Sequence, residues 1–361
     1  MRQKQQSDYN DNSAPGPQPS SLAIWFTAPR TVEIRETLLR RPSEGEVQIR
    51  ARYSGISAGT ERLVYRGEVP GDMPLDLTIP TIKGSFAFPI KYGYSSVGQI
   101  VKVGPCVKGF KEGDMVFAFN PHETEYVIPA RLAVKLPDGI DPRKGIFLAG
   151  IETAINVMLD AAPRIGERVI IFGQGVVGLL VTQLAARMCA SLIATVEPVE
   201  KRRALSLALG ASFTVDPTTE SAAAKIRDLT DGVGGDVVIE ASGQSSALDE
   251  AVKAAAAESR VIVVSWYGTK RTPLALGDAF HRNRITIKSS QVSNLDPELS
   301  PRWTAQRRQE LALAYLSELN LDALITRTFP FEDAAAAYRF VDEQSEEALQ
   351  IILDFGSVAN V

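Results

Sequence analysis

Residues 168–178 read RVIIFGQGVVG, and this stretch decides the fold. Its first five residues form a continuous apolar run, which is typical of a strand covered on both faces of a parallel sheet. Apolar residues then recur at helical spacing, at Val177, Val181, Leu184 and Met188. A strand that passes through a glycine-rich turn into a helix predicts a doubly wound α/β domain.

Gly173, Gly175 and Gly178 match the pattern G-x-G-x-x-G. The first glycine permits the tight turn, the second lets the backbone approach a pyrophosphate, and the third permits close packing of helix on strand. Val176 and Val177 begin the helix, whose free N–H groups and positive dipole end favour phosphates. The turn therefore predicts a dinucleotide site; the alternative is a set of turn glycines with no ligand.

The end of the next predicted strand carries an acidic residue, Glu197, 19 residues after Gly178. A carboxylate at about this spacing hydrogen-bonds the adenosine ribose and repels a 2′-phosphate, so NAD is predicted. Arg202 lies nearby and would accommodate a phosphate, which leaves NADP open. Because ligands bind at the carboxyl ends of parallel strands, we also expect cofactor contacts from later strand ends, at Ser242, Gly243, Ser265 and Trp266. Trp266 could instead flank the substrate or pack against a second subunit.

The rest of the chain is organised around this motif. Before it, alternating strands such as 46–53 and dense glycine and proline predict a β-rich segment with irregular loops. After it, apolar runs alternate with helical stretches. Strands are expected at 191–196, 236–241, 260–264, 284–288 and 348–355, and helices at 199–209, 247–258 and 303–318. We therefore expect a disordered tail at 1–20, a catalytic domain at 21–155, a dinucleotide-binding domain at 156–298 and a return segment at 299–361 that completes the catalytic domain.

The composition of the 361 residues narrows the class of function. The formal net charge of −4 argues against a nucleic-acid or anionic membrane partner. No run of 18 apolar residues and no secretory apolar stretch is present. Two cysteines, Cys106 and Cys189, cannot form a disulfide framework, so a reducing cytoplasm is expected. With only two histidines, His122 and His281, little material remains for a soft-ligand metal site.

Two stretches of the first half resemble a known superfamily. Residues 54–61, SGISAGTE, look like its loop G-I-C-G-T-D, and residues 92–101, YGYSSVGQIV, look like its stretch G-H-E-x-x-G-x-V. Over about residues 22–355 the chain resembles the medium-chain dehydrogenase/reductase superfamily. The resemblance implies a GroES-like catalytic domain beside a Rossmann domain, a small-molecule alcohol or carbonyl substrate, and a homodimer.

The zinc ligands of this superfamily are replaced here. Zinc-dependent members hold a catalytic zinc with the cysteine of the first motif and the histidine of the second, with the glutamate nearby. The corresponding residues are Ser57, Tyr94 and Ser95. Hydroxyl groups are poor zinc ligands at neutral pH. The structural zinc lobe needs four clustered cysteines, whereas only Cys106 lies in that region, and Cys189 is expected in the core. We therefore expect no zinc of either kind.

Within the superfamily, residues 54–63, SGISAGTERL, resemble the bacteriochlorophyllide a dehydrogenase-like group. Its members carry S-G-I-S-x-G-T-E-R and a tyrosine in place of the histidine, and they oxidise a hydroxyethyl group on a chlorin. The chain departs from this group at Ser95, where a glutamate is common. It departs from zinc-type members at Gln350, where a basic residue often contacts the pyrophosphate. Sugar, cyclitol, chlorin and lipid ketone substrates all remain open.

Without a metal, hydrogen-bond donors must polarise the substrate oxygen. Thr60 is the first candidate, because it aligns with the hydroxyl residue that relays the alcohol proton in the zinc enzymes. Tyr94 is the second, because a phenol can donate to a carbonyl or accept from an alcohol. Ser57 would complete the pocket, or would only satisfy its own backbone.

Glu61 and His122 are the remaining catalytic candidates. Glu61 is expected to orient Thr60 or to pair with Arg62. Family members often have a cleft-facing histidine at the position of His122, which could shuttle a proton near neutral pH; the alternative is a structural histidine.

These observations predict a zinc-independent, NAD(P)-dependent oxidoreductase that acts on a secondary alcohol or ketone. A quinone or enone reductase of the same superfamily is an alternative, although Thr60 favours the alcohol chemistry. A cofactor-binding protein without turnover is a third possibility.

Overall fold

The predicted parallel sheet is present in the computed structural model, which describes residues 20–76, 78–188 and 190–356. Its strands lie in the order β11-β10-β9-β12-β13-β14, and every pairing is parallel. Successive strands run outward in one direction from β9 (Arg168–Phe172) and in the other from β12 (Gly235–Glu240). The order therefore reverses between β9 and β12, and ligands of such sheets bind outside the carboxyl ends at this point.

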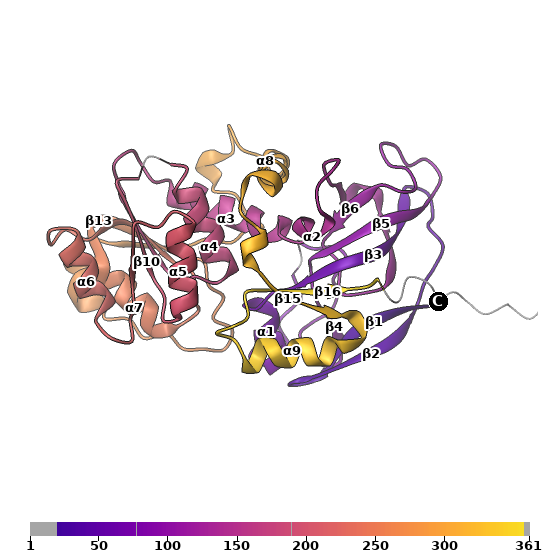
Figure 1. Cartoon of the computed structure of the whole chain (residues 1–361), viewed down its shortest axis with the longest axis horizontal. Coiled ribbons are helices and arrows are strands. Elements are labelled where there is room, and N and C mark those ends of the chain that lie inside the picture. Colours follow the sequence, from indigo (N-terminus) through magenta and orange to yellow (C-terminus); the bar gives the residue numbers. More distant parts are fainter. Residues whose placement is uncertain (1–19, 77, 189, 357–361) are drawn as a thin grey trace, which may run out of the picture.

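Helices cover both faces of this sheet, which fills the left lobe of Figure 1. The other strands are β10 (Leu192–Val196), β11 (Phe213–Val215), β13 (Ala255–Val263) and β14 (Thr286–Ser289). The helices are α3 (Leu148–Ala161), α4 (Val176–Ala185), α5 (Glu200–Ala208), α6 (Ala222–Leu229), α7 (Ser245–Ala254) and α8 (Ala305–Glu318). Ile171 of β9 packs into one core and Ile170 into the other. This two-sided burial explains the continuous apolar strand.

One predicted helix, 247–258, is too long. Helix α7 ends at Ala254, and β13 begins at Ala255, five residues before the predicted strand. The alanine-rich run has high helix propensity. Strand pairing overrides this helix propensity, because Ala255 lies opposite Gly235 of β12 and is fully buried there. The other predicted strands and helices of this lobe lie within a few residues of the observed ones.

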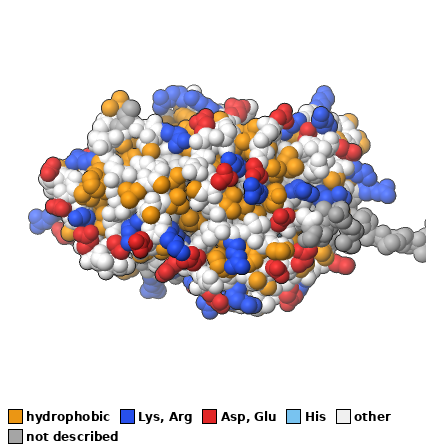
Figure 2. All heavy atoms as spheres, viewed as in Figure 1, with side chains coloured by type: hydrophobic (Ala, Val, Ile, Leu, Met, Phe, Trp, Pro, Cys, Tyr) orange, Lys and Arg blue, Asp and Glu red, His pale blue; other side chains and the backbone are white. Residues whose placement is uncertain are grey.

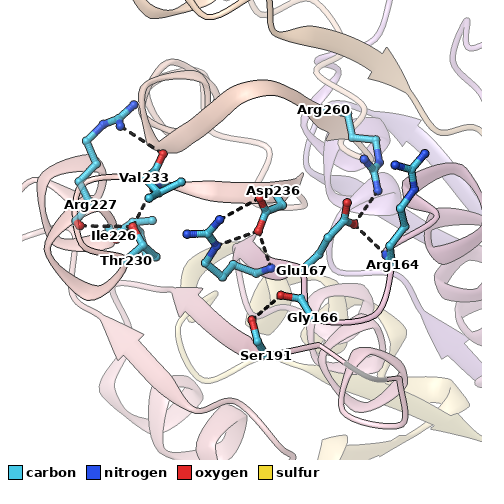
Figure 3. Close-up of polar contacts among 12 residues, drawn as sticks. Arg164, Gly166, Glu167, Ser191, Ile226, Arg227, Thr230, Val233, Asp236 and Arg260 are labelled. Carbon is cyan, nitrogen blue, oxygen red and sulfur yellow. Dashed lines mark hydrogen bonds and ion pairs between the residues drawn. The ribbon is translucent and has the colours of Figure 1, made fainter.

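Ion pairs hold the amino ends of the central strands together (Figure 3). Asp236 accepts hydrogen bonds from the backbone and the guanidinium of Arg168, at 2.8–3.0 Å. Glu167 accepts from Arg260 at 2.9 Å and from the backbone of Arg164 at 2.7 Å. These contacts occupy the end of the sheet opposite the glycine-rich turn, so the carboxyl end is left for ligands.

The right lobe of Figure 1 is built on a seven-stranded sheet. The order is β15-β16-β3-β5-β6-β8, and β7 pairs with β3. The strands are β3 (Glu46–Ile56), β5 (Ser96–Val103), β6 (Met115–Ala118), β7 (Glu125–Pro129), β8 (Ala133–Lys135), β15 (Ile325–Pro330) and β16 (Gln350–Asp354). A second sheet contains β1 (Ser20–Ala28), β2 (Thr31–Leu38) and β4 (Ile90–Lys91). The helices are α1 (Thr60–Arg66), α2 (Pro142–Gly145) and α9 (Ala334–Glu343).

The chain returns to this lobe after the parallel sheet. Strand β16 pairs antiparallel with β3, with Ile351 opposite Ile56, and β15 pairs with the outer side of β16. Helix α9 packs on β2 and α1. The predicted boundary between residues 155 and 156 falls inside α3, and the domain limits stay a prediction.

Three sequence-based expectations concern the surface and the ends. The predicted tail and Cys189 lie outside the described residues, except that Ser20 begins β1. Among the described residues, no helix is long and apolar enough to cross a membrane. On the face drawn in Figure 2, basic and acidic side chains are interspersed.

Candidate active site

Three predicted hydroxyl residues come together beside the end of β3. Ser57 follows this strand, Thr60 begins α1, and Tyr94 lies between β4 and β5. The side chains of Ser57 and Thr60 lie close enough to the Tyr94 phenol to influence its pKa. The loop at 57–60 and the strand entry at 94 thus place three hydroxyl groups around one point.

The pKa of Tyr94 is raised above its ordinary value. Burial is the largest cause, and the charge of Glu61 acts in the same direction, while the Ser57 and Thr60 hydroxyls oppose it. A phenol in this state keeps its proton at neutral pH and is a hydrogen-bond donor.

Glu61 lies behind this point at the centre of a buried network. The backbone N–H of Ser57 donates to its Oε1 at 3.0 Å, and the Tyr338 hydroxyl donates to its Oε2 at 2.5 Å. Nε2 of His122 lies 2.9 Å from the same Oε2. Because a carboxylate only accepts, Nε2 carries the proton. Nδ1 lies beside the Ser54 hydroxyl, which donates to the Ser95 carbonyl at 3.0 Å. The network fixes the loop that carries Ser57.

Two expectations for this network differ from the geometry. Glu61 does not pair with Arg62, because its oxygens are taken by the three donors above; within residues 20–356, no ion pair of Arg62 is present. Burial and the neighbouring Arg66 lower the pKa of Arg62. His122 is fully buried rather than cleft-facing, and both ring nitrogens are bonded inside the protein. Any proton that it shuttled would have to pass through Glu61 or Ser54.

The side chains at the family's zinc position do not fit a zinc ion. Ser57 and Tyr94 offer hydroxyls, and the Ser95 hydroxyl donates to the backbone carbonyl of Ile146 at 2.6 Å. The nearest imidazole, that of His122, has no free nitrogen. In the described part of the chain, no three His, Cys, Asp or Glu side chains gather to hold a metal. Zinc sites in proteins use thiolate, imidazole or carboxylate ligands, and this donor set contains none that is available.

The glycine-rich turn joins β9 to α4 as predicted. Gly173 has a φ of +88°, and a Cβ there would come within 2.6 Å of the Ser242 backbone. A Cβ at Gly178 would lie 2.0 Å from the carbonyl oxygen of Gly173. At Gly175 nothing lies within 4 Å, so that side of the turn has open space. The first amides of α4, at Val176 and Val177, have no acceptor within the helix and face a ligand that approaches its end.

Glu197 lies at the end of β10, against this turn. It accepts from the backbone N–H of Gln174 at 2.7 Å and from that of Val199 at 3.1 Å, and the residue is 4 % exposed. The carboxylate thus stands where the adenosine ribose is expected. Within the described chain, the Arg202 side chain forms no ion pair with Glu197. Its guanidinium donates to the carbonyl of Ser345 and, at 2.9 Å, to that of Ala348.

A buried carboxylate, Glu240, organises the predicted nicotinamide side. Its Oε1 accepts from the backbone of Ser242 at 2.7 Å and of Gly243 at 3.2 Å. Its Oε2 accepts from the Tyr267 hydroxyl at 2.7 Å, and Ser265 accepts from the Gly243 backbone at 2.8 Å. Burial and this carboxylate raise the pKa of Tyr267. The loops after β12 and β13 are therefore held as one unit.

Sequence reasoning missed Glu240, Tyr338 and Ser54 as members of these networks. Glu240 ends an apolar strand with an acid, which was a usable signal. Tyr338 comes from α9, 277 residues after its partner Glu61, and nothing local marks it. The amide of Gln350 donates to the carbonyls of Ile56 and Ile351 at 3.2 and 2.9 Å, so it serves the β3–β16 pairing.

Comparison with known proteins supports the fold and the class of enzyme. Residues 43–138 match the alcohol dehydrogenase GroES-like domain, and residues 176–306 match the zinc-binding dehydrogenase family. D-guloside 3-dehydrogenase of Escherichia coli K12 is 27 % identical over 344 residues, covering 91 % of this chain and 98 % of the relative.

Solved structures share the fold at lower identity. The 2R,3R-butanediol dehydrogenase of Bacillus subtilis aligns with a TM-score of 0.77 at 21 % identity, covering 93 % of this chain and 99 % of the other. An alcohol dehydrogenase from Escherichia coli CFT073 in complex with NADH has a TM-score of 0.75 at 19 % identity, with 93 % and 99 % coverage.

These matches confirm two predictions, the GroES-like plus Rossmann fold and an alcohol dehydrogenase-type enzyme. The chain is an oxidoreductase built from the two domains of the zinc-type alcohol dehydrogenases of the medium-chain dehydrogenase/reductase superfamily.

Proposed function

We propose that this protein is a zinc-independent, NAD(P)-dependent oxidoreductase that interconverts a secondary alcohol and a ketone. The observation that carries the proposal is the Tyr94 phenol, which lies beside the Ser57 and Thr60 side chains at a position where the family has a zinc ligand. Two relatives support the substrate class, because D-guloside 3-dehydrogenase and 2R,3R-butanediol dehydrogenase are named for hydroxylated substrates.

The cofactor site consists of the glycine-rich turn, the α4 amides and Glu197. The open side of Gly175 and the free amides of Val176 and Val177 would take the pyrophosphate. Glu197 would accept from the adenosine ribose hydroxyls and repel a 2′-phosphate, which favours NAD over NADP. The loops at Ser242, Gly243 and Ser265 would hold the nicotinamide amide. When bound, the cofactor accepts or supplies the hydride.

The hydroxyl residues handle the substrate oxygen. In the reductive direction, the Tyr94 O–H donates to the carbonyl oxygen and stabilises the charge that develops there. As hydride reaches the carbon, the phenolic proton passes to that oxygen, and a proton from solvent returns to Tyr94 through the partly exposed hydroxyls of Thr60 and Ser57. In the oxidative direction, the alcohol proton takes the reverse path. Glu61 positions Ser57 through its backbone N–H, and His122 holds Glu61 in place.

We further propose a homodimer in the cytoplasm, with no nucleic-acid or membrane partner. In the described chain, β14 ends the parallel sheet, and its outer edge has N–H and C=O groups that a second copy could pair. The interspersed surface charges and the net charge of −4 agree with a small-molecule partner alone.

Substrate panels with NADH and NADPH test the proposal. We expect turnover of secondary alcohols or their ketones, and a fall in kcat of about 100-fold in Tyr94→Phe with an unchanged Kd for NADH. Tyr65→Phe is the control, because Tyr65 is a buried tyrosine stacked on Tyr338. Turnover of quinones or enones alone would favour the reductase alternative. Tight NADH binding with no turnover of any panel would favour a protein without catalysis.

A further inference from the structure

A row of aromatic side chains runs from the hydroxyl residues toward the parallel sheet. The ring of Tyr94 lies 6.2 Å from that of Tyr92, and Tyr92 lies 5.5 Å from Phe86. Phe86 in turn lies 5.6 Å from Trp266, measured between ring centroids. The row therefore begins at the proposed proton donor in one lobe and ends on the loop after β13 in the other.

The loop that carries Trp266 is hydrogen-bonded to both lobes. Tyr267 is tied to Glu240, and the backbone N–H of Thr269 donates to the carbonyl of Glu68 at 3.1 Å. A second link between the lobes joins the hydroxyls of Thr78 and Ser293 at 2.7 Å. The position of Trp266 is thus fixed relative to Tyr94.

The indole is nevertheless left open. Trp266 is 36 % exposed, whereas Phe86 and Tyr92 are 6 % and 4 % exposed. An anchored, exposed aromatic face at the carboxyl end of a parallel strand is a binding surface in this class of sheet. None of the four side chains in the row is charged at neutral pH. The exposed indole of Trp266 therefore suits a neutral group that presents an apolar face.

We propose that Trp266, backed by Phe86, is a substrate subsite that takes a ring. The proposal rests on the function proposed above and defines its substrate as a secondary alcohol or ketone on, or next to, a neutral ring. The ring lies on the indole, and the part of the substrate that carries the reacting carbon extends from there toward Tyr94. Of the roles that the sequence left open for Trp266, this proposal selects the contact with the substrate over the contact with the nicotinamide. Sugar rings present C–H faces and aryl rings present π faces, and an indole binds either.

Kinetics of Trp266→Ala test the assignment with three substrates: methyl glucopyranoside, 1-phenylethanol and the acyclic 2-butanol. We expect kcat/KM to fall about tenfold or more for at least one ring substrate, with 2-butanol and the Kd of NADH changed less than about twofold. Trp266→Phe should restore most of the loss. Trp303→Ala is the matched control, because Trp303 stacks on Arg307 at 4.3 Å, away from the row. Which ring substrate is affected distinguishes sugar from aryl rings.

Equal losses for all three substrates, together with a raised Kd for NADH, would overturn the proposal and return Trp266 to the cofactor. A binding measurement separates this outcome from failure of the proposed function. In NADH-saturated protein, a ring compound should quench tryptophan fluorescence, and Trp266→Phe should abolish the quenching whether or not the compound is turned over. Binding of ring compounds no tighter than that of 2-butanol would refute the subsite even in an active enzyme.

Discussion

Nε2 of His122 lies 2.9 Å from Oε2 of Glu61, and both side chains are completely buried. The carboxylate receives three donors, from His122, Tyr338 and the Ser57 backbone. It thereby joins α1, α9 and the segment before β7, and it sets the loop that carries two of the proposed hydroxyl groups.

Glu61→Gln tests this network. The amide oxygen can still accept from one donor, but the amide N–H₂ faces donors that then lose their acceptor. We expect a loss of about 1–3 kcal/mol in the free energy of unfolding, measured by denaturant titration, and a lower kcat. Glu343→Gln, at an exposed position of α9, is the control and should change neither. Wild-type stability in Glu61→Gln would show that the buried hydrogen bonds contribute little.

Thr60→Val tests the proton relay, because valine keeps the shape and removes the hydroxyl. We expect kcat to fall about 10- to 100-fold, while Thr60→Ser keeps most of the activity. Steady-state kinetics at saturating NADH measure the difference. If the valine and serine variants were equally active, the hydroxyl would have no part in the relay.

The proposal that hydroxyl groups at Ser57, Tyr94 and Ser95 replace the zinc ligands predicts metal-independent activity. We expect elemental analysis of the purified protein to find well under about one zinc per chain, and dialysis against a chelator to leave kcat unchanged. One equivalent of tightly held zinc, with activity lost on chelation and regained on adding the metal back, would contradict the proposed mechanism.

Glu197 should set the cofactor preference. In Glu197→Gln the charge that repels a 2′-phosphate is gone, while an oxygen remains for the Gln174 backbone. We expect the Kd for NADPH to fall relative to that for NADH by about tenfold, measured by nucleotide fluorescence. Glu200→Gln, three residues along on α5, controls for a general change of charge. An unchanged ratio would place the ribose elsewhere.

The raised pKa of Tyr94 predicts opposite pH profiles for the two directions. Reduction needs the protonated phenol, so its rate should stay level from pH 6 upward and fall only above the ordinary tyrosine pKa of about 10. Oxidation needs the phenol to receive or pass on a proton, so its rate should rise with pH over the same range. Initial rates in both directions measure this. Identical profiles in wild type and Tyr94→Phe would show that another group controls the pH dependence.

Local patterns predicted much of this structure. The turn at Gly173–Gly178 and its acid Glu197 were found because strand, turn and helix are consecutive in sequence. Ser57, Thr60 and Tyr94 came from two short stretches, and the fold brings them to one point. The alternative that paired Glu61 with Arg62 was wrong, because the side chains that contact Glu61, His122 and Tyr338, belong to distant segments. The helix at 247–258 was predicted too long because alanine favours helices, and nothing in the local sequence shows that Ala255 pairs with Gly235 of a neighbouring strand.

Strand β16 gives the chain an order of assembly. Its Gln350 hydrogen-bonds Ile56 of β3, and the two residues are 294 positions apart. A ribosome adding roughly 5–20 residues per second needs roughly 15–60 s to cover that distance. During this interval the end of β3 at Tyr53–Ile56 lacks its β16 partner, although β7 can already pair with Glu46–Arg50, and the parallel sheet, whose strands are complete earlier, can close. The lobe that is translated first is therefore finished last, once β16 has been made.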